Sequence, residues 1–432
     1  MNEVAYKLSP AAQGNPMETT VTRSTRSMPQ SGMPATAIRE HLQQLDLPEP
    51  YAHFARAFRG PQDVQEIGKW AYDQFMSENG FFSMYLPYMQ TIEQEVIAMG
   101  VSLLHPQATS TGNFTSGGTE SNFSGMHAAR NWARVHKPKV KKPNVVAPLT
   151  IHPSFQKAAR YLDVEVITTD LDANGRGIAA NIAAAINDNT VMLAASAPSW
   201  HFANIDPIPE IAALAVQHGL WMHVDGCVGG YVNPFLEQLG EKLTPWDFRV
   251  PGVMSISADL HKFGYCPKPA STIYWREAAL QEYHYVAVDD PFLGQYKLAG
   301  FSGSRSAGPI FAAWSVFNYL GMDGYLRLTR RLLDLKKRLT EEISAIEGLK
   351  VWQIDVMPMH FHSERAPTAA VYQGLFDKGW LMLGLVKPEA ITICVDPALT
   401  DDDVTLFLKD LREVTERILA GGDAKAGTIR YG

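Results

Sequence analysis

The sequence predicts an α/β protein, with a large domain built on a mostly parallel sheet and a small α+β domain at its C-terminal end. Short apolar runs alternate with helical patterns through the middle of the chain, and this alternation stops after Gly321. At 432 residues the chain is also too long for one small core. We therefore expect an N-terminal arm at 1–65, a large domain at 66–320 and a small domain at 321–432.

Six candidate strands follow one another in the large domain, and each is a short apolar run. They cover residues 145–151, 164–169, 191–195, 221–225, 253–257 and 272–275. Between the third and the fourth, Pro207 and Pro209 would begin a helix whose buried face includes Ile211. Strand, helix and strand repeated at this spacing predict crossover connections and a mostly parallel sheet that is buried on both sides.

Elements outside this alternation are predicted from periodicity and from helix-start signals. Apolar residues recur at three- and four-residue steps over 89–103 and again over 328–343, which predicts two amphipathic helices. A strand candidate at 391–395 precedes a last helix, for which Thr400 and the acidic residues after it provide an N-terminal signal. Residues 1–35 show no period and are rich in Ser, Thr, Pro and Met, so we expect a flexible or partner-embracing arm there.

Composition and charge exclude several classes of protein. Hydrophobic residues make up 46% and charged residues 19% of the chain, and the net charge of -7 offers no basic field for nucleic acid or anionic lipid. No run approaches about 18 apolar residues, and the first residues lack a secretory signal. Cys227, Cys266 and Cys394 are too few and too far apart for a disulfide framework or a zinc cluster. We expect a cytoplasmic protein without a metal that binds neither nucleic acid nor membrane.

A glycine-rich segment is a candidate phosphate site. Residues 115–122 read TSGGTESN and are followed by a helical run. Gly117 and Gly118 let the backbone approach an anion closely, and the helix start offers free N–H groups and the positive end of a dipole. No Gly-Lys-Ser/Thr follows, so this is no Walker loop. A purely structural turn from strand to helix is the alternative.

Two polar residues stand at the ends of strand candidates. His152 begins the run HPSFQKAARY, and a histidine there either lies flat against a conjugated ring or caps the strand end. Asp225 lies in the segment HVDGCVGG, where an uncompensated carboxylate would be expensive to bury. Its partner would be a protonated pyridine nitrogen or, alternatively, the N-terminus of a neighbouring helix.

Lys262 follows a further strand candidate, in the segment SISADLHKFGYCPK. It sits among small residues and directly after His261. Desolvation there would favour the neutral, nucleophilic amine, which makes Lys262 a candidate for a Schiff base; a surface lysine in a turn is the alternative. The phosphate turn, His152, Asp225 and Lys262 thus follow in order at the carboxyl ends of successive strands, where open α/β sheets bind ligands.

These segments resemble those of the group II decarboxylases, which depend on pyridoxal 5′-phosphate (PLP) and have the aspartate aminotransferase fold, called fold type I. Within that family, the most similar forms are those of the sphingosine-1-phosphate lyases, in TSGGTES, HxxFxKAA, IDPIPEIAALA, HVDxCxGG and SISADxHKxGYxPK. The resemblance is dense over 90–320 and loose in the C-terminal part. It implies a PLP-binding large domain of fold type I.

The resemblance also implies roles for individual residues. Lys262 would form the Schiff base with PLP, Asp225 would pair with the pyridine nitrogen, and His152 would stack on the ring. Residues in and near the phosphate turn would hold the phosphate: Gly118, Thr119 and His261, with Ser121 or Asn122 assisting. Lys268 matches a second active-site lysine.

A later segment implies that two subunits share each site. Gly303, Ser304 and Arg305 resemble a segment that approaches the cofactor phosphate from the neighbouring subunit. The loop before it carries more aromatic surface than an exposed loop should, in Tyr283, Tyr285, Phe292 and Tyr296. We therefore expect a homodimer as the catalytic unit.

Departures from the family bear on the substrate. Gly226 stands where an alanine usually lies beneath the ring, which predicts extra room at that point. The segment FFSMYLPY at 81–88 replaces one that shapes the substrate end of the site in the lyases. A phosphorylated long-chain base therefore does not follow from the resemblance.

We expect a PLP-dependent lyase that acts on a small-molecule amine at Cα by retro-aldol cleavage and releases an aldehyde. The alternative is an L-amino-acid decarboxylase for an acidic or an aromatic substrate, the latter because of Phe81, Tyr85, Tyr88 and Trp200. Aminotransferase chemistry would need a carboxylate-binding arginine, for which Arg365 is the candidate. A non-catalytic PLP carrier would show slow or absent turnover.

Overall fold

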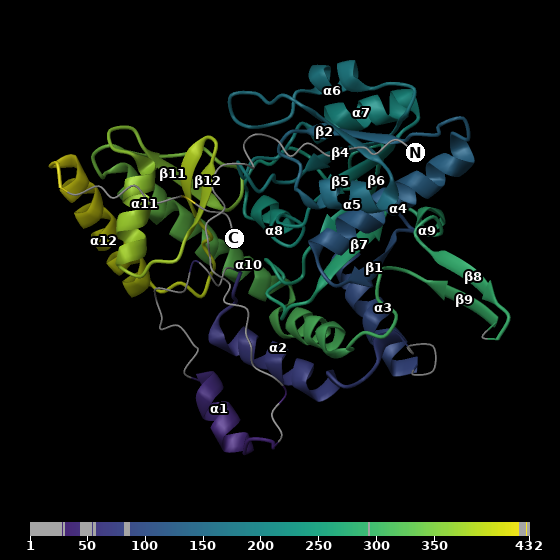
Figure 1. Cartoon of the computed structure of the whole chain (residues 1–432), viewed down its shortest axis with the longest axis horizontal. Coiled ribbons are helices and arrows are strands. Elements are labelled where there is room, and N and C mark those ends of the chain that lie inside the picture. The colour runs from purple at the N-terminus through teal and green to yellow at the C-terminus, as the bar shows by residue number, and fades with distance from the viewer. Residues whose placement is uncertain are drawn as a thin grey trace. The chain divides into compact units, whose positions relative to one another are not determined.

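The computed structural model in Figure 1 describes residues 28, 31–43, 54, 58–81, 87–292, 294–422 and 429. The chain divides into two compact units, 1–48 and 49–432. The first contains helix α1 (Ala35–Gln43), in which no side chain is buried. Most of the expected arm at 1–35 lies outside the described residues.

A seven-stranded sheet organises the second unit, with the order β1-β7-β6-β5-β4-β2-β3. Its strands are β1 (Thr111–Thr115), β2 (Asn144–Pro148), β3 (Glu165–Thr169), β4 (Thr190–Ser196), β5 (Trp221–Asp225), β6 (Val253–Ala258) and β7 (Ser271–Trp275). β7 is antiparallel to both of its neighbours, β1 and β6, whereas the pairs from β6 to β3 are parallel. The prediction of a mostly parallel sheet is confirmed, and the six strand candidates correspond to β2–β7. β1 lacks an apolar run and was not among those candidates.

Helices cover both faces of this sheet, because neighbouring residues of a strand point to opposite sides. Val145 of β2 lies in one core cluster with Phe155, a residue of the helix that follows β2. Val146 lies in the other cluster with Ile211, from the helix between β4 and β5. Every residue of β2, β4, β5 and β7 is buried. This is the burial that the apolar runs predicted.

The helices of this part agree with the predicted ones where periodicity was clear. They are α2 (Gln62–Phe75), α3 (Pro87–Ser102), α4 (Gly118–His136), α5 (Ser154–Leu162), α6 (Ala179–Ala185), α7 (Ile208–His218), α8 (Asn233–Gln238), α9 (Ala278–Gln281) and α10 (Gly308–Ser344). α3 confirms the helix predicted over 89–103, and α7 begins after Pro207 as expected. α10 is interrupted at Gly321, whose φ of 54° lies in the left-handed region that glycine tolerates.

A four-stranded antiparallel sheet follows, in the order β10-β11-β13-β12. It consists of β10 (Leu349–Val351), β11 (Met359–Ser363), β12 (Leu383–Val386) and β13 (Glu389–Ile393), with helices α11 (Thr368–Asp377) and α12 (Asp401–Leu419). Thr400 and Asp403 form a capping box at the start of α12, in which each side chain accepts a hydrogen bond from the other residue's backbone N–H. Such a cap is worth about 1 kcal/mol. The predicted α+β character of the C-terminal part is confirmed.

The loop between β7 and α10 contains a two-stranded hairpin that the sequence did not reveal, β8 (Val286–Asp290) with β9 (Gly294–Leu298). Figure 1 shows it projecting from the edge of the sheet near β1 and β7. Phe292 in its turn is 93% exposed, and Val286 and Val288 are about half exposed. Of the aromatic residues noted in this loop, Phe292 and Tyr296 are exposed within a single chain, whereas Tyr283 and Tyr285 are half-buried.

Candidate active site

The four polar motifs converge at the carboxyl ends of neighbouring strands. Asp225 is the last residue of β5, in register with Ser196 of β4 and Ser257 of β6. Gly118 begins α4 shortly after β1, His152 follows β2, and Lys262 follows β6. The charges of Asp225 and Lys262 both act on the pKa of His152, so the three groups lie near one another. The parallel order of β6, β5, β4 and β2 places these ends on one edge of the sheet.

Lys262 is held by an acid that the sequence analysis overlooked. Its Nζ lies 2.8 Å from Oδ2 of Asp259, and the lysine side chain is 21% exposed. Burial lowers the pKa of Lys262, but the charge of Asp259, the nearby Cys227 and the hydrogen bond to Asp259 outweigh it, so the pKa lies above the usual 10.5. The expectation that desolvation makes this amine neutral is therefore wrong. An acid three positions before the lysine was the signal that could have revealed the pair.

A chain of buried hydroxyl groups holds Asp259 in turn. Oδ1 of Asp259 accepts a hydrogen bond from Ser271 Oγ at 2.5 Å, and Ser271 Oγ lies 2.8 Å from Ser121 Oγ. Ser121 Oγ is also 2.6 Å from Thr115 Oγ1. The Ser121 hydroxyl is thus engaged on both sides inside the protein. Its expected role at the phosphate stays a prediction, and these contacts also connect Ser121 through Ser271 to Asp259.

Asp225 is an ionised acid with nearly complete burial. It is 6% exposed, and its Oδ2 accepts a hydrogen bond from Asn122 Nδ2 at 2.9 Å. Oδ1 accepts from the Cys227 N–H at 3.1 Å and lies 3.3 Å from Ser257 Oγ. Burial raises the pKa of Asp225, yet the electrostatic interaction with His152, the hydrogen bonds from Cys227 and the positive charge of Lys262 hold this pKa below its usual value. A buried carboxylate of this kind suits a protonated ring nitrogen.

His152 is held in one tautomer. Its Nδ1 accepts a hydrogen bond from the backbone N–H of Ser154 at 3.1 Å and lies 2.9 Å from Ser154 Oγ. The ring proton of a neutral His152 is therefore on Nε2. Burial lowers the pKa of His152 by more than the negative charge of Asp225 raises it. The ring is neutral at neutral pH and suits contact with a conjugated ring.

The first turn of α4 suits a phosphate. An added Cβ at Gly118 would lie 2.6 Å from Cys227 Sγ and 2.8 Å from Asp259 Oδ2, so this position has no room for a side chain. No side chain caps the helix, and within the described part of the chain the N–H groups of Gly118 and Thr119 have no hydrogen-bond acceptor. His261 lies beside the turn, 14% exposed and with Nε2 3.7 Å from Asp259 Oδ2. The residues present fit the phosphate, the ring nitrogen and the aldehyde carbon of PLP.

Two further expectations concern the surroundings of Lys262. Burial, followed by the charge of Lys262, lowers the pKa of Lys268, so the second lysine does lie near the first. The extra room expected at Gly226 is not there. An added Cβ would lie 2.8 Å from the backbone oxygen of Ser257 and 3.3 Å from Trp246, because this position faces β6 and the core.

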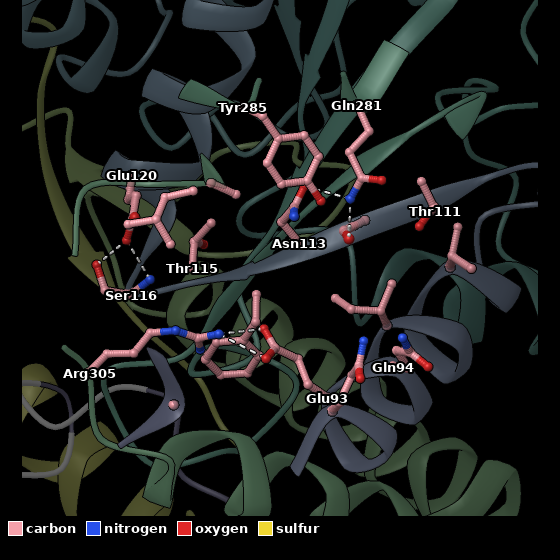
Figure 2. Close-up of a pocket in the computed structure, with 18 of the residues that line it drawn as sticks. Glu93, Gln94, Thr111, Asn113, Thr115, Ser116, Glu120, Gln281, Tyr285 and Arg305 are labelled. Atoms are coloured by element: carbon pink, nitrogen blue, oxygen red, sulfur yellow. Dashed lines mark hydrogen bonds and ion pairs between the residues drawn. The ribbon is translucent and has the colours of Figure 1, made fainter. Parts of the chain in front are cut away.

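Gly303 and Ser304 lie beside a cavity of about 920 Å³ next to the phosphate turn. Figure 2 shows Ser116 and Glu120 on one side of this cavity, and Arg305 paired with Glu93 on another. Ser304 Oγ accepts a hydrogen bond from Asn79 at 3.1 Å. The cavity also extends along α3 and β1, and the residues lining it include none of Lys262, Asp225 and His152.

The residues considered for substrate recognition are dispersed. Phe81 lines the cavity, Tyr88 contacts Phe311, and Trp200 contacts Phe58. Tyr85 lies outside the described residues. Arg365 is 57% exposed and forms an ion pair with Glu347, so it is no ready ligand for a substrate carboxylate.

No group of three or more His, Cys, Asp or Glu side chains in the described ranges could hold a metal ion. None of the helices described is both long and apolar enough to cross a membrane.

Fold and site together define a PLP-dependent enzyme of fold type I. The chain belongs to the pyridoxal-dependent decarboxylase family, since the family model for the pyridoxal-dependent decarboxylase conserved domain matches residues 67–358. The expected family and the cofactor PLP are thereby confirmed.

The relatives include both lyases and decarboxylases. A sphingosine-1-phosphate lyase of Arabidopsis thaliana is 35% identical over 338 residues, which cover 76% of this chain and 61% of that protein. A probable L-tyrosine/L-aspartate decarboxylase of Methanothrix thermoacetophila is 32% identical over 352 residues, 82% of this chain and 88% of that protein. The solved structure of a Burkholderia pseudomallei sphingosine-1-phosphate lyase has a TM-score of 0.85 at 31% identity and covers 96% of both chains. This chain therefore spans about three fifths of the Arabidopsis relative.

Proposed function

We propose that this protein is a PLP-dependent lyase that cleaves the Cα–Cβ bond of a β-hydroxy amine by retro-aldol chemistry and releases an aldehyde. The observation that carries the proposal is the meeting of Asp225, His152, Lys262 and the first turn of α4 at one edge of the sheet. Retro-aldol cleavage is favoured because a lyase structure matches the chain over 96% of its length at 31% identity.

Each residue of the site has a task in this proposal. Lys262 attaches PLP covalently, Asp225 keeps the pyridine nitrogen protonated, and the neutral ring of His152 packs against the cofactor. The phosphate is held by N–H groups of the α4 turn and by a neighbouring side chain, namely Gly118, Thr119 and His261. Bound PLP supplies the sink for the electron pair left at Cα when a bond to that carbon breaks.

Two lysines would move the protons. Lys262 Nζ lies beside Asp259, whose carboxylate would stabilise the ammonium form of the lysine while its amine exchanges a proton with Cα. Burial and the charge of Lys262 lower the pKa of Lys268, which makes its neutral form more accessible than that of an ordinary lysine. Lys268 is therefore the candidate base for the β-hydroxyl proton whose removal accompanies aldehyde release.

Decarboxylation of an L-amino acid is the second candidate function. It is supported by the probable L-tyrosine/L-aspartate decarboxylase, which matches at 32% identity and of which this chain covers 88%. The same pocket would serve either reaction, because the bond that breaks is the one aligned perpendicular to the cofactor ring. Arg365, paired on the surface with Glu347, offers no support for aminotransferase chemistry.

One experiment separates these functions. The purified PLP-loaded protein is incubated with L-amino acids, β-hydroxy amino acids and phosphorylated amino alcohols, and aldehyde and CO₂ are measured in parallel. Aldehyde from a β-hydroxy amine supports the proposal, and CO₂ without aldehyde supports the decarboxylase. If PLP binds and neither product forms from any of these substrates, the protein acts as a carrier and both proposals fail.

Assembly, location and domain limits belong to the same proposal. A homodimer with shared sites is supported by the exposed hairpin β8–β9. A cytoplasmic location is supported by three cysteines that form no disulfide. The interruption of α10 at Gly321 supports the boundary between a PLP-binding domain at 66–320 and a small domain at 321–432, after an N-terminal segment at 1–65.

A further inference from the structure

Asn122 occupies the centre of the hydrogen-bond network behind the cofactor residues. It is the fifth residue of α4, directly after the first turn Gly118–Ser121. Its side chain is on the face of the helix that packs against the sheet and is 1% exposed. Its Nδ2 donates to Asp225 Oδ2 at 2.9 Å and to Ser154 Oγ at 3.0 Å. Its Oδ1 accepts from Ser257 Oγ at 2.8 Å and lies 3.2 Å from His223 Nε2. Both donors and both acceptor positions of the carboxamide are therefore used.

The orientation of this carboxamide is determined by its neighbours. Asp225 is ionised and can only accept, so the Asn122 nitrogen must face it; the reversed amide would place two oxygens against each other. Burial lowers the pKa of His223 to about 4, so this ring is neutral at neutral pH. Because Asn122 Oδ1 cannot donate, His223 must donate from Nε2, and its Nδ1 accepts from Ser255 Oγ at 2.8 Å.

The second arm of the network reaches His152. Ser154 Oγ accepts from Asn122, which leaves its own hydrogen free to point to His152 Nδ1 at 2.9 Å. The backbone N–H of Ser154 donates to the same nitrogen. The Asn122 carboxamide thus connects Asp225, the proposed partner of the pyridine nitrogen, with His152, the proposed partner of the ring face.

The neighbouring helix residues leave room for this arrangement. One turn after Asn122, an added Cβ at Gly125 would lie 2.7 Å from His223 Nδ1. α4 can therefore approach β5 closely enough for the Asn122 side chain to reach Asp225 only because residue 125 is glycine. The family resemblance implies a role for Asn122 at the phosphate, and its side-chain contacts add a second one at Asp225.

We propose that Asn122 is a positioning residue for the cofactor: it orients the Asp225 carboxylate toward the pyridine nitrogen and, through Ser154, keeps the His152 ring in the Nε2–H form. This inference rests on the proposed roles of Asp225 and His152. A buried hydrogen bond to a charged group strongly restricts its geometry, since any other orientation leaves a buried polar atom without a partner.

The test measures PLP binding to the apoprotein by equilibrium dialysis, together with the stability of the apoprotein in urea. Asn122→Ala is compared with Asn144→Ala, a matched control. Asn144 is also buried and bonded through both ends of its amide, to Asn187 and Thr190, but it lies at the opposite end of β2. Both variants should lose stability, whereas only Asn122→Ala should raise the PLP dissociation constant, by roughly ten- to a hundredfold.

A pH profile gives a second readout that loss of packing would not produce. In Asn122→Asp a second carboxyl lies beside Asp225, and one of the two must take up a proton at a raised pKa. The PLP affinity of this variant should therefore change with pH as the shared proton of the two carboxyls is lost. Wild type and Asn144→Ala have no such carboxyl pair and should not show this change. Ser154→Ala cuts only the arm to His152 and should raise the dissociation constant severalfold, so it provides the test if Asn122→Ala does not fold.

Asp225→Asn is measured in parallel to separate this inference from the proposed function. If Asp225→Asn weakens PLP binding and the variants of Asn122 and Ser154 do not, Asn122 only packs α4 against the sheet and the inference is overturned. If Asp225→Asn also leaves PLP affinity unchanged, the proposed role of Asp225 fails as well.

Discussion

Lys262 Nζ lies 2.8 Å from Oδ2 of Asp259, three residues earlier in the chain, and this pair controls the charge at the centre of the site. Asp259 is 2% exposed and its other oxygen accepts a hydrogen bond from Ser271. Because the acid cannot turn to solvent, the amine is held in one place. Asp259 therefore holds Lys262 in position and also raises the pKa of the lysine.

Removing the acid should destabilise the apoprotein at neutral pH. The folded pKa of Lys262 is raised above 10.5, so the stability from this pair is fully present below pH 10.5 and is lost only as the pH rises through the folded value. Asp259→Asn should lower the free energy of unfolding by roughly 3–5 kcal/mol, the cost of breaking a buried pair. Urea denaturation with a double-mutant cycle to Lys262→Met measures the coupling. Additive effects of the two substitutions would show that the pair contributes nothing.

Covalent attachment of the cofactor should depend on Lys262 alone. The PLP-loaded protein should be yellow, and reduction with borohydride followed by peptide mapping should find the cofactor on the peptide that contains Lys262. Lys262→Ala should lose this label while retaining PLP through the α4 turn. Lys268→Ala is the matched control, because it changes the neighbouring lysine and should keep the label. A label on Lys268 in the wild-type protein would refute the assignment.

Asp225 should be essential for turnover but not for folding. Asp225→Asn keeps a side chain of the same size and removes the negative charge, which should slow the reaction on the order of a thousandfold. Circular dichroism and urea denaturation check the fold. Asp247→Asn changes another buried acid, which pairs with Arg249 and His105 away from the site, and should leave turnover largely unchanged. Full turnover in folded Asp225→Asn would remove Asp225 from the mechanism.

Asp206 should make the stability depend on pH in the weakly acidic range. Burial raises its pKa from 3.8 to about 6, against hydrogen bonds from the Gly177 and Ser196 N–H groups at 2.8 Å. The folded state thus binds the extra proton, and its stability falls as the pH rises from 3.8 to about 6. The contribution is on the order of 3 kcal/mol at about 1.4 kcal/mol per pKa unit. The unfolding free energy of wild type minus that of Asp206→Asn should fall by this amount between pH 3.8 and about 6 and stay level above that pH. A difference that does not change with pH would contradict the raised pKa.

Arg305 should link assembly to cofactor retention. Its guanidinium binds both carboxylate oxygens of Glu93, at 2.7 and 2.8 Å, which ties the loop of Gly303 and Ser304 to α3. Arg305→Ala should loosen this loop, so sedimentation should show weaker dimerisation and dialysis a faster loss of PLP. The control is Arg338→Ala, since Arg338 has nearly the same exposure, 31% against 30%, and pairs with Glu342 on the surface of α10. A fully active PLP-loaded monomer would refute the shared site.

Much of the fold follows from local pattern. The apolar runs that became β2, β4, β5 and β7 are buried on both faces, and a chain with such runs has few arrangements open to it other than a sheet covered by helices. Thr400 and Asp403 predict the start of α12, because the cap that they form involves only residues close in sequence. β1 and the hairpin β8–β9 were not apparent. β1 and β9 have no apolar run, and each strand is held by pairing with another strand.

The polar motifs were also sufficient to establish the cofactor and the edge of the sheet that binds it, because strand ends in a parallel sheet meet at one edge. Which side chains contact one another across the site depends on three-dimensional packing. The sequence places Asn122 and Ser121 side by side, yet successive helix residues point about 100° apart, so Asn122 reaches Asp225 whereas Ser121 reaches Ser271. In the same way, Gly226 faces Ser257 and not the ring, and Asp259 determines the charge of Lys262. Which way each side chain points, and how far it lies from side chains of other strands and helices, is decided only when the sheet and its helices pack together.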